Sequence, residues 1–180
     1  MDIPIRFKIY LLWKNLFSKK EDGPHIKISK EGRGVRSVLF FLPEKKEDAK
    51  VINYFVKVEN PLPDYEIGLV CSDKSKSFYP HVENVSLFTY NDDDLNYFNT
   101  IKSASLLNEI KIKNYDAIVD LNTNFCAASS MLSFDLDAPL KIGFDSLINR
   151  KIYTITIERK EDAFLESYFS RILSLLGVKF

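Results

Sequence analysis

The sequence is poor in the residues that build metal centres, disulfide frameworks and catalytic triads. Its 180 residues include two histidines and two cysteines, and the cysteines are not spaced as a CxxC pair. No Cys/His metal site is therefore expected, and we interpret His25 and His81 as surface residues of a linker and a loop. Cys71 and Cys126 fall in an expected strand and an expected helix, which indicates reduced, partly buried thiols.

Long hydrophobic runs are also absent. No apolar stretch approaches the ~20 residues needed to cross a bilayer, and no small-residue cleavage site follows an apolar N-terminal stretch. We therefore expect neither an integral membrane protein nor an evident signal peptide, and we predict a cytoplasmic location. No GxGxxG or GxxxxGK[ST] motif follows a predicted strand, because Gly32 and Gly34 precede the first one, so no bound cofactor is expected.

An excess of one charge is lacking as well, because 25 basic residues balance 25 acidic ones. This balance produces no net field that would favour nucleic acid as a partner. The distribution is uneven, however, since residues 1–36 hold nine basic and four acidic residues and the remainder carries the opposite net charge. A basic entry segment thus precedes an acidic body.

The sequence opens with an amphipathic segment, residues 5–17 (IRFKIYLLWKNLF), that has helical spacing. Basic residues surround its apolar face, a pattern that is more often typical of a helix packed on its own domain or on a partner protein. The other interpretation is contact with the anionic inner face of the cytoplasmic membrane. We predict a helix and linker over 1–34 and a folded domain over 35–180. The apolar face consists of Ile5, Ile9, Leu12, Trp13 and Leu16, of which the last four are the predicted membrane contacts.

From residue 35 onward, apolar runs typical of buried strands alternate with segments of helical periodicity. Such alternation predicts right-handed βαβ units and an α/β fold with a Rossmann-like, doubly wound, mostly parallel sheet. The strands are expected at 35–42, 66–71, 84–90, 115–121, 140–144 and 152–157, and the helices at 44–58, 95–110, around 126–131 and at 161–176, closed by Gly177. The aromatic residues expected in the core include Phe40, Phe41, Phe55 and Phe98.

Polar side chains follow two of the predicted strands. Asn122, Thr123 and Asn124 come directly after the fourth strand, and ligands of open α/β sheets bind outside the carboxyl ends of strands. These three residues are therefore candidates for ligand binding, although capping of the next helix by Thr123 or Asn124 is the alternative. Three aspartates at 92–94 follow the third strand, and we interpret them as a solvated helix start because calcium loops space their ligands at alternate positions.

Two short blocks and the order of the elements resemble a known enzyme family. The segment YDAIVDLN at 115–122, the segment APLKIGF at 138–144 and the closing LSLLGV at 173–178 are similar to the N-terminal domain of the ADP-heptose lipopolysaccharide heptosyltransferases. These are two-domain GT-B glycosyltransferases, and the resemblance covers about residues 35–178. It implies a Rossmann-like domain that corresponds to the acceptor-side half of such an enzyme.

The resemblance also implies a role for one carboxylate. In the family, the loop after the first strand ends in a Gly-Asp pair whose Asp is regarded as the general base, and Asp48 aligns with that Asp. Glu47 replaces the Gly, which would strain a turn that needs φ > 0. Glu44, Lys45 and Lys46 replace small residues and are expected to fill the space of an acceptor sugar. We therefore favour the interpretation of Asp48 as an acid of the first helical turn over its interpretation as a catalytic base.

The family binds its nucleotide sugar chiefly with a second domain, to which nothing in this sequence corresponds. We therefore expect a non-catalytic, heptosyltransferase-like binding or interaction module, associated peripherally with the membrane. The alternative is the acceptor-side half of a split glycosyltransferase of lipopolysaccharide or cell-envelope glycan synthesis, with a protein partner that supplies the second domain. An unrelated small α/β protein is a third interpretation.

Overall fold

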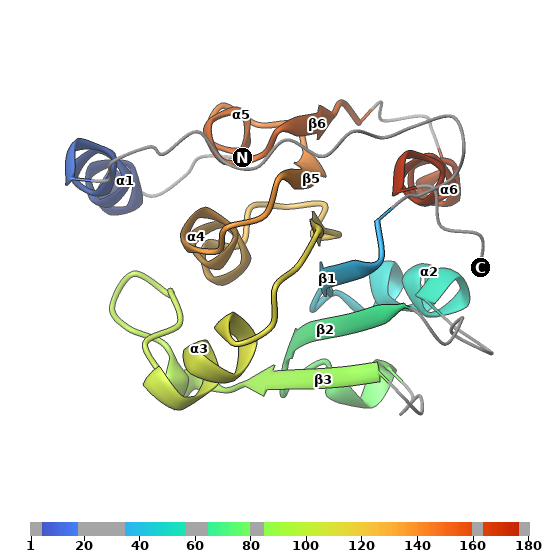
Figure 1. The fold of residues 1–180 in the computed structure, drawn as a ribbon, viewed down its shortest axis with the longest axis horizontal. Coiled ribbons are helices and arrows are strands. Elements are labelled where there is room, and N and C mark those ends of the chain that lie inside the picture. Colours follow the sequence, from blue (N-terminus) through green and yellow to red (C-terminus); the bar gives the residue numbers. More distant parts are fainter. Residues whose placement is uncertain (1–4, 18–34, 57–64, 80–84, 160–163, 177–180) are drawn as a thin grey trace.

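The structure, a computed structural model, describes residues 5–17, 35–56, 65–79, 85–159 and 164–176. Six parallel strands form one sheet in the order β3-β2-β1-β4-β5-β6. Figure 1 shows helices α3 and α4 on one face of this sheet and α2 and α6 on the other. The predicted doubly wound, parallel α/β fold is therefore confirmed.

The elements alternate along the chain as in successive βαβ units. The strands are β1 (Ser37–Phe41), β2 (Glu66–Ser72), β3 (Val85–Tyr90), β4 (Ala117–Asp120), β5 (Leu140–Phe144) and β6 (Ile155–Ile157). The helices are α1 (Ile5–Phe17), α2 (Lys46–Val56), α3 (Ala104–Lys111), α4 (Ala127–Asp135), α5 (Asn149–Ile152) and α6 (Leu165–Leu176), with 3₁₀ turns η1 (Lys76–Phe78) and η2 (Asp92–Asp94).

One predicted helix is wrong over half its length. The helix expected at 95–110 begins only at Ala104, and the preceding residues form a loop closed by an antiparallel bridge between Leu95 and Ile101. The side chain of Asn96 explains the difference, because its oxygen accepts hydrogen bonds from two backbone amides of this loop at 2.9 and 3.1 Å. Asn side chains compete in this way with helical hydrogen bonds, and Asn99 adopts φ 58°.

The last predicted strand is also shorter than expected. Residues 149–152 form helix α5, and the strand itself covers only Ile155–Ile157. The side chain of Asn149 donates to the carbonyl of Phe144 at 2.8 Å, which holds this helical turn against the end of β5. The local apolar pattern does not reveal this contact.

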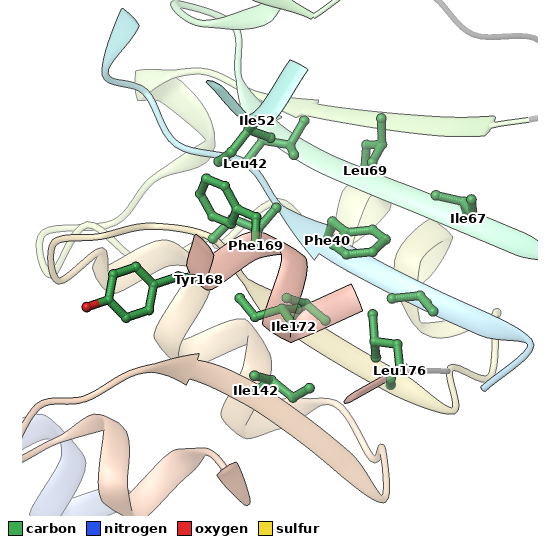
Figure 2. Packing of buried hydrophobic residues seen from close by; sticks show 14 of the residues in the cluster. Phe40, Leu42, Ile52, Ile67, Leu69, Ile142, Tyr168, Phe169, Ile172 and Leu176 are labelled. Carbon is green, nitrogen blue, oxygen red and sulfur yellow. The ribbon is translucent and has the colours of Figure 1, made fainter. Parts of the chain in front are cut away.

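The core lies on both faces of the sheet. All five residues of β1 are buried, as expected for a central strand covered by helices on both sides. Figure 2 shows Phe169, Ile172 and Leu176 of α6 packed against the sheet residues Phe40 and Ile142. Phe41 belongs to the cluster on the opposite face, so the predictions that Phe40 and Phe41 are core residues are confirmed. Phe98 is only half-buried, and the side chain of Phe55 lies outside the described residues.

Helix α1 lies outside the three layers. Its Phe7 is 2% exposed and packs in a separate cluster with residues of α4 and α5. In the part of the chain that the structure describes, no helix is long and apolar enough to cross a membrane. The predicted linker with Gly32 and Gly34, both histidines, and Gly177 lie outside the described residues. The expected domain boundary near residue 34 therefore stays a prediction.

Candidate functional site

A cavity of about 540 Å³ opens at the carboxyl ends of the central strands. Strand β1 pairs with β2 on one side and with β4 on the other, so the strand order reverses between β1 and β4. Crevices at such reversal points are where open α/β sheets bind ligands. The loops after β1, β2, β3 and β4 line this cavity, together with one face of α1. We call it the carboxyl-edge pocket.

Asp48 reaches the pocket from the first turn of α2. Its Oδ2 accepts a hydrogen bond of 2.7 Å from the hydroxyl of Thr123, which follows β4. The bond joins residues that are 75 positions apart and links the loops of the two strands at the reversal point. Asp48 is thus a first-turn acid, as predicted, and it also faces the pocket. The side chain lies ready to accept hydrogen bonds from a bound molecule.

The three predicted ligand-binding residues, Asn122, Thr123 and Asn124, all line the same pocket. The alternative that Thr123 or Asn124 caps the next helix is wrong, because the N-cap of α4 is Cys126 and it makes no side-chain capping bond. Thr123 donates to Asp48 instead. Among the described residues, the amide of Asn124 makes no side-chain hydrogen bond, so it is available to a ligand.

The loop between β1 and α2 borders the cavity. Glu44 and Lys45 are exposed and line it, and Lys46 is exposed at the start of α2. That these side chains fill the space of an acceptor sugar stays a prediction. Tyr79 holds this loop in place, because its buried hydroxyl donates to the carbonyl of Pro43 at 2.7 Å. Glu47 lies within α2 with no positive φ, so the strain expected at this position does not arise.

A buried carboxylate that the sequence analysis did not select supports the pocket from below. Asp120, the last residue of β4, is 3% exposed and accepts four hydrogen bonds. They come from the hydroxyls of Tyr153 (2.6 Å) and Ser129 (2.7 Å) and from the side chain (2.8 Å) and backbone (3.0 Å) of Asn122. Asp120 thus fixes the start of the pocket loop. The sequence signal that could have identified Asp120 is a carboxylate at the end of an apolar strand.

Burial raises the pKa of Asp120 above its ordinary value of 3.8, and the four donors only partly oppose this effect. The folded state therefore binds this proton more tightly than the unfolded chain does. The resulting stabilisation is complete below about pH 4 and is lost as the pH rises through the pKa of the folded state. Relative to Asp120→Asn, which cannot ionise, the wild type should lose free energy of unfolding as the pH rises.

Urea unfolding of both proteins over a pH series measures this difference directly. Because other titrating groups contribute equally to both proteins, the subtraction isolates residue 120. A difference that stays constant with pH would show that Asp120 keeps the pKa of an exposed aspartate. A free energy of unfolding of the wild type that rises with pH relative to that of Asp120→Asn would contradict the sign of the predicted effect.

Aromatic rings form the apolar part of the pocket. Phe125 meets Phe7 of α1 edge to face at 4.8 Å between ring centroids, and Phe98 stacks on Tyr10 at 4.9 Å. Phe7, Phe98 and Phe125 all line the cavity. Cys126 is half-buried at the same wall, and burial raises the pKa of its thiol. Both cysteines are free, with Cys71 fully buried in β2.

Charges of both signs stand at the pocket rim. Lys74 binds Asp92 with Nζ to Oδ1 at 2.6 Å, and both side chains are mostly exposed. Asn91 caps the 3₁₀ turn of the three aspartates through bonds to two backbone amides. This agrees with their interpretation as a solvated turn, although the helix expected to follow them directly is absent. In the described ranges, no three His, Cys, Asp or Glu side chains are grouped as metal ligands.

The predicted membrane face of α1 points away from the domain where it is described. Ile5, Ile9 and Leu12 are 74%, 60% and 58% exposed. The helix packs on the domain through the opposite residues, Phe7 and Tyr10. Packing and membrane contact therefore do not compete for one face. The side chains of Trp13 and Leu16 lie outside the described residues.

Groups that suit a hydroxylated molecule converge in the carboxyl-edge pocket. The carboxylate of Asp48 and the free amide of Asn124 accept and donate hydrogen bonds, and the rings of Phe98 and Phe125 offer apolar contact area. Clefts in which polar groups converge beside apolar walls are typical of small-molecule sites. The arrangement is thus suited to binding.

A family model described as "Family of unknown function (DUF6913)" matches residues 10–177. No curated protein matches the sequence. The fold is similar to a glycosyl transferase family 9 structure from Veillonella parvula DSM 2008, with 18% identity, a TM-score of 0.55, and coverage of 80% of this chain and 42% of that one.

It is also similar to the E. coli heptosyltransferase WaaC. The structure with ADP gives 12% identity, a TM-score of 0.54 and coverage of 79% of this chain and 48% of that chain. The structure with ADP-2-deoxy-2-fluoro heptose gives 14% identity, a TM-score of 0.57 and coverage of 79% of this chain and 49% of that chain. The fold of this chain thus resembles part of the fold of these glycosyltransferases, and the chain spans less than half the length of each of them.

Proposed function

We propose that this chain, which belongs to the DUF6913 family of unknown function, is a non-catalytic binding module that holds a hydroxylated ligand in the carboxyl-edge pocket. One observation carries the proposal. Asp48, Thr123 and Asn124, from loops far apart in sequence, converge in one cavity at the reversal point of the sheet. The GT-B-like fold supports a sugar-like ligand by analogy alone.

The surroundings of Asp48 support binding without catalysis. Asp48 already accepts a hydrogen bond from Thr123, and the charged side chains of Glu44 and Lys45 line the same pocket. We expect the purified chain to transfer no sugar from a nucleotide sugar to an acceptor. Transfer by the chain unaided would refute the non-catalytic assignment.

Asp48→Asn should weaken the binding of a neutral monosaccharide by about tenfold. The substitution replaces a charge-assisted hydrogen bond by a neutral one, which costs roughly 1.5 kcal/mol of binding free energy. Isothermal calorimetry with a panel of neutral monosaccharides measures the affinity. Asp93→Asn is the matched control, because Asp93 is exposed and does not line the pocket. Equal affinities of the two variants would remove Asp48 from the site.

The second candidate is the acceptor-side half of a split glycosyltransferase. The position of Asp48 in the pocket favours it, since the resemblance aligns this residue with a general base. In that function, Asp48 would take the proton of an acceptor hydroxyl during an inverting displacement at the sugar C1. Affinity capture from native cells would identify a donor-binding partner. Activity of the mixed proteins that survives Asp48→Asn would exclude the residue as the base.

The proposal also includes peripheral association with the inner face of the cytoplasmic membrane through α1. Exposed Ile9 and Leu12 support it. Ile9→Glu and Leu12→Glu should each abolish flotation of the chain with phosphatidylglycerol vesicles. Ile112→Glu, at an apolar residue that is 79% exposed outside α1, makes the same charge change and should leave flotation intact. Loss of flotation in all three variants would show that the added negative charge, and not the loss of the apolar face of α1, prevents vesicle binding.

A further inference from the structure

Helix α1 has two apolar faces that point in opposite directions. At about 100° per residue, Phe7 lies roughly 160° around the helix from both Ile5 and Ile9. The structure bears this out in burial, because Phe7 is 2% exposed whereas Ile5 and Ile9 are 74% and 60% exposed. One helix thus presents an inner face to the domain and an outer face to the surroundings.

The inner face forms a wall of the carboxyl-edge pocket. Phe7 and Arg6 line the cavity directly. The ring contacts of Phe7 with Phe125 and of Tyr10 with Phe98 join α1 to two different pocket loops. Removal of α1 would therefore open the pocket on this side.

The outer face has the charge pattern of a helix that lies on an anionic bilayer. Leu12 and Ile9 form an exposed apolar stripe, and the exposed cation Lys8 lies beyond one border of it. A cation beside such a stripe complements anionic lipid headgroups, while the stripe enters the boundary of the acyl region. Arg6, beyond the other border, turns toward the domain, where its guanidinium lies 4.8 Å from the centre of the Tyr97 ring. We take an anionic bilayer as the partner of this face.

We propose that α1 couples the pocket to an anionic bilayer, so that docking of its outer face holds its inner face in place as the pocket wall. This rests on the proposed membrane association and goes beyond it. An isolated helix of 13 residues is marginal in water. Packing through Phe7 and docking through Ile9 both need the same folded helix, so whichever occurs first lowers the ordering cost of the other.

Coupling of this kind is reciprocal. Weakening the inner contacts must therefore weaken lipid binding, although Phe7 and Phe125 do not face the lipid. Bilayer binding must in turn close the pocket wall, which slows the reaction of the half-buried Cys126 with a thiol reagent. Neither effect is expected if α1 binds lipid as an independent helix.

The experiment titrates the full chain with vesicles of phosphatidylglycerol and follows the fluorescence of Trp13, the single tryptophan of the sequence. Phe125→Ala removes a ring from the domain side and leaves the sequence of α1 unchanged. It should lower vesicle affinity about fivefold or more, the lower end of typical coupling energies. Phe7→Ala should do the same, and Ile112→Ala is the control.

The second readout is the rate at which Ellman's reagent modifies Cys126, with Cys126→Ala identifying the signal. Phosphatidylglycerol vesicles should slow this rate several-fold, and phosphatidylcholine vesicles should leave it unchanged. Wild-type affinity of Phe125→Ala, with an unchanged thiol rate, would overturn the coupling while membrane association stands. If the wild type binds no vesicles, the coupling and the proposed membrane association are both wrong. Self-association abolished by Ile9→Glu without vesicle binding would identify a second copy as the partner instead.

Discussion

Gly143→Ala should destabilise the protein by about 2–6 kcal/mol. A Cβ at this position of β5 would lie 2.5 and 2.6 Å from two ring carbons of Tyr153, which is 5% exposed. Overpacking in a core costs about 1–3 kcal/mol, and the ring has to move. Its hydroxyl would then lose the 2.6 Å bond to Asp120, which adds about 1–3 kcal/mol for an unsatisfied buried group.

A double-mutant cycle tests this cause with urea unfolding as the measurement. In a Tyr153→Leu background the offending ring is gone, so Gly143→Ala should cost much less there than in the wild type. An equal cost in both backgrounds would show that the strain arises in the strand itself. Because Asp120 also accepts a hydrogen bond from Asn122, we expect Gly143→Ala alone to disturb the pocket loop as well.

Phe169→Ala should cost about 3–5 kcal/mol, the usual range for truncating a fully buried Phe. Phe169 of α6 is 2% exposed and meets the ring of Phe144 edge to face with centroids 6.4 Å apart. Figure 2 shows it between the sheet and neighbouring apolar side chains. The cavity left behind would lie within the larger core cluster.

Phe164→Ala is the matched control for this substitution. Phe164 directly precedes α6 and is 81% exposed, so the same chemical change should alter the free energy of unfolding by less than about 0.5 kcal/mol. The two midpoints in urea, at equal slope, provide the comparison. Similar losses in the two variants would mean that α6 does not pack on the sheet as described.

The sequence predicts the sheet well because burial on both faces leaves a strong local signal. The apolar run of β1 indicates a central strand whatever surrounds it. The loop before α3 leaves no such signal. Its residues have helical periodicity, but the side-chain bonds of Asn96 and the left-handed conformation of Asn99 decide its structure. Hydrophobic periodicity does not register either effect.

The site is predictable to the extent that topology determines it. Residues that follow adjacent parallel strands meet at one edge of the sheet, so the convergence of Asp48 with Thr123 follows from the predicted fold. The network of Asp120 does not, because Tyr153 lies 33 residues away and approaches only through α5. For α1, periodicity identifies an apolar face without showing what covers it. The helix packs on the domain through the opposite face, with Phe7 and Tyr10.

The central claim is that the carboxyl-edge pocket is the ligand site of this chain. The most direct measurement is a titration of the ¹⁵N-labelled protein with a neutral monosaccharide, read by the backbone amide resonances. We predict that the shifts concentrate at residues 122–124 and Asp48, and that Asp48→Asn needs about ten times more sugar to reach the same shifts. Shifts confined to the opposite edge of the sheet, or no shift at the pocket with any monosaccharide of the panel, would contradict the account.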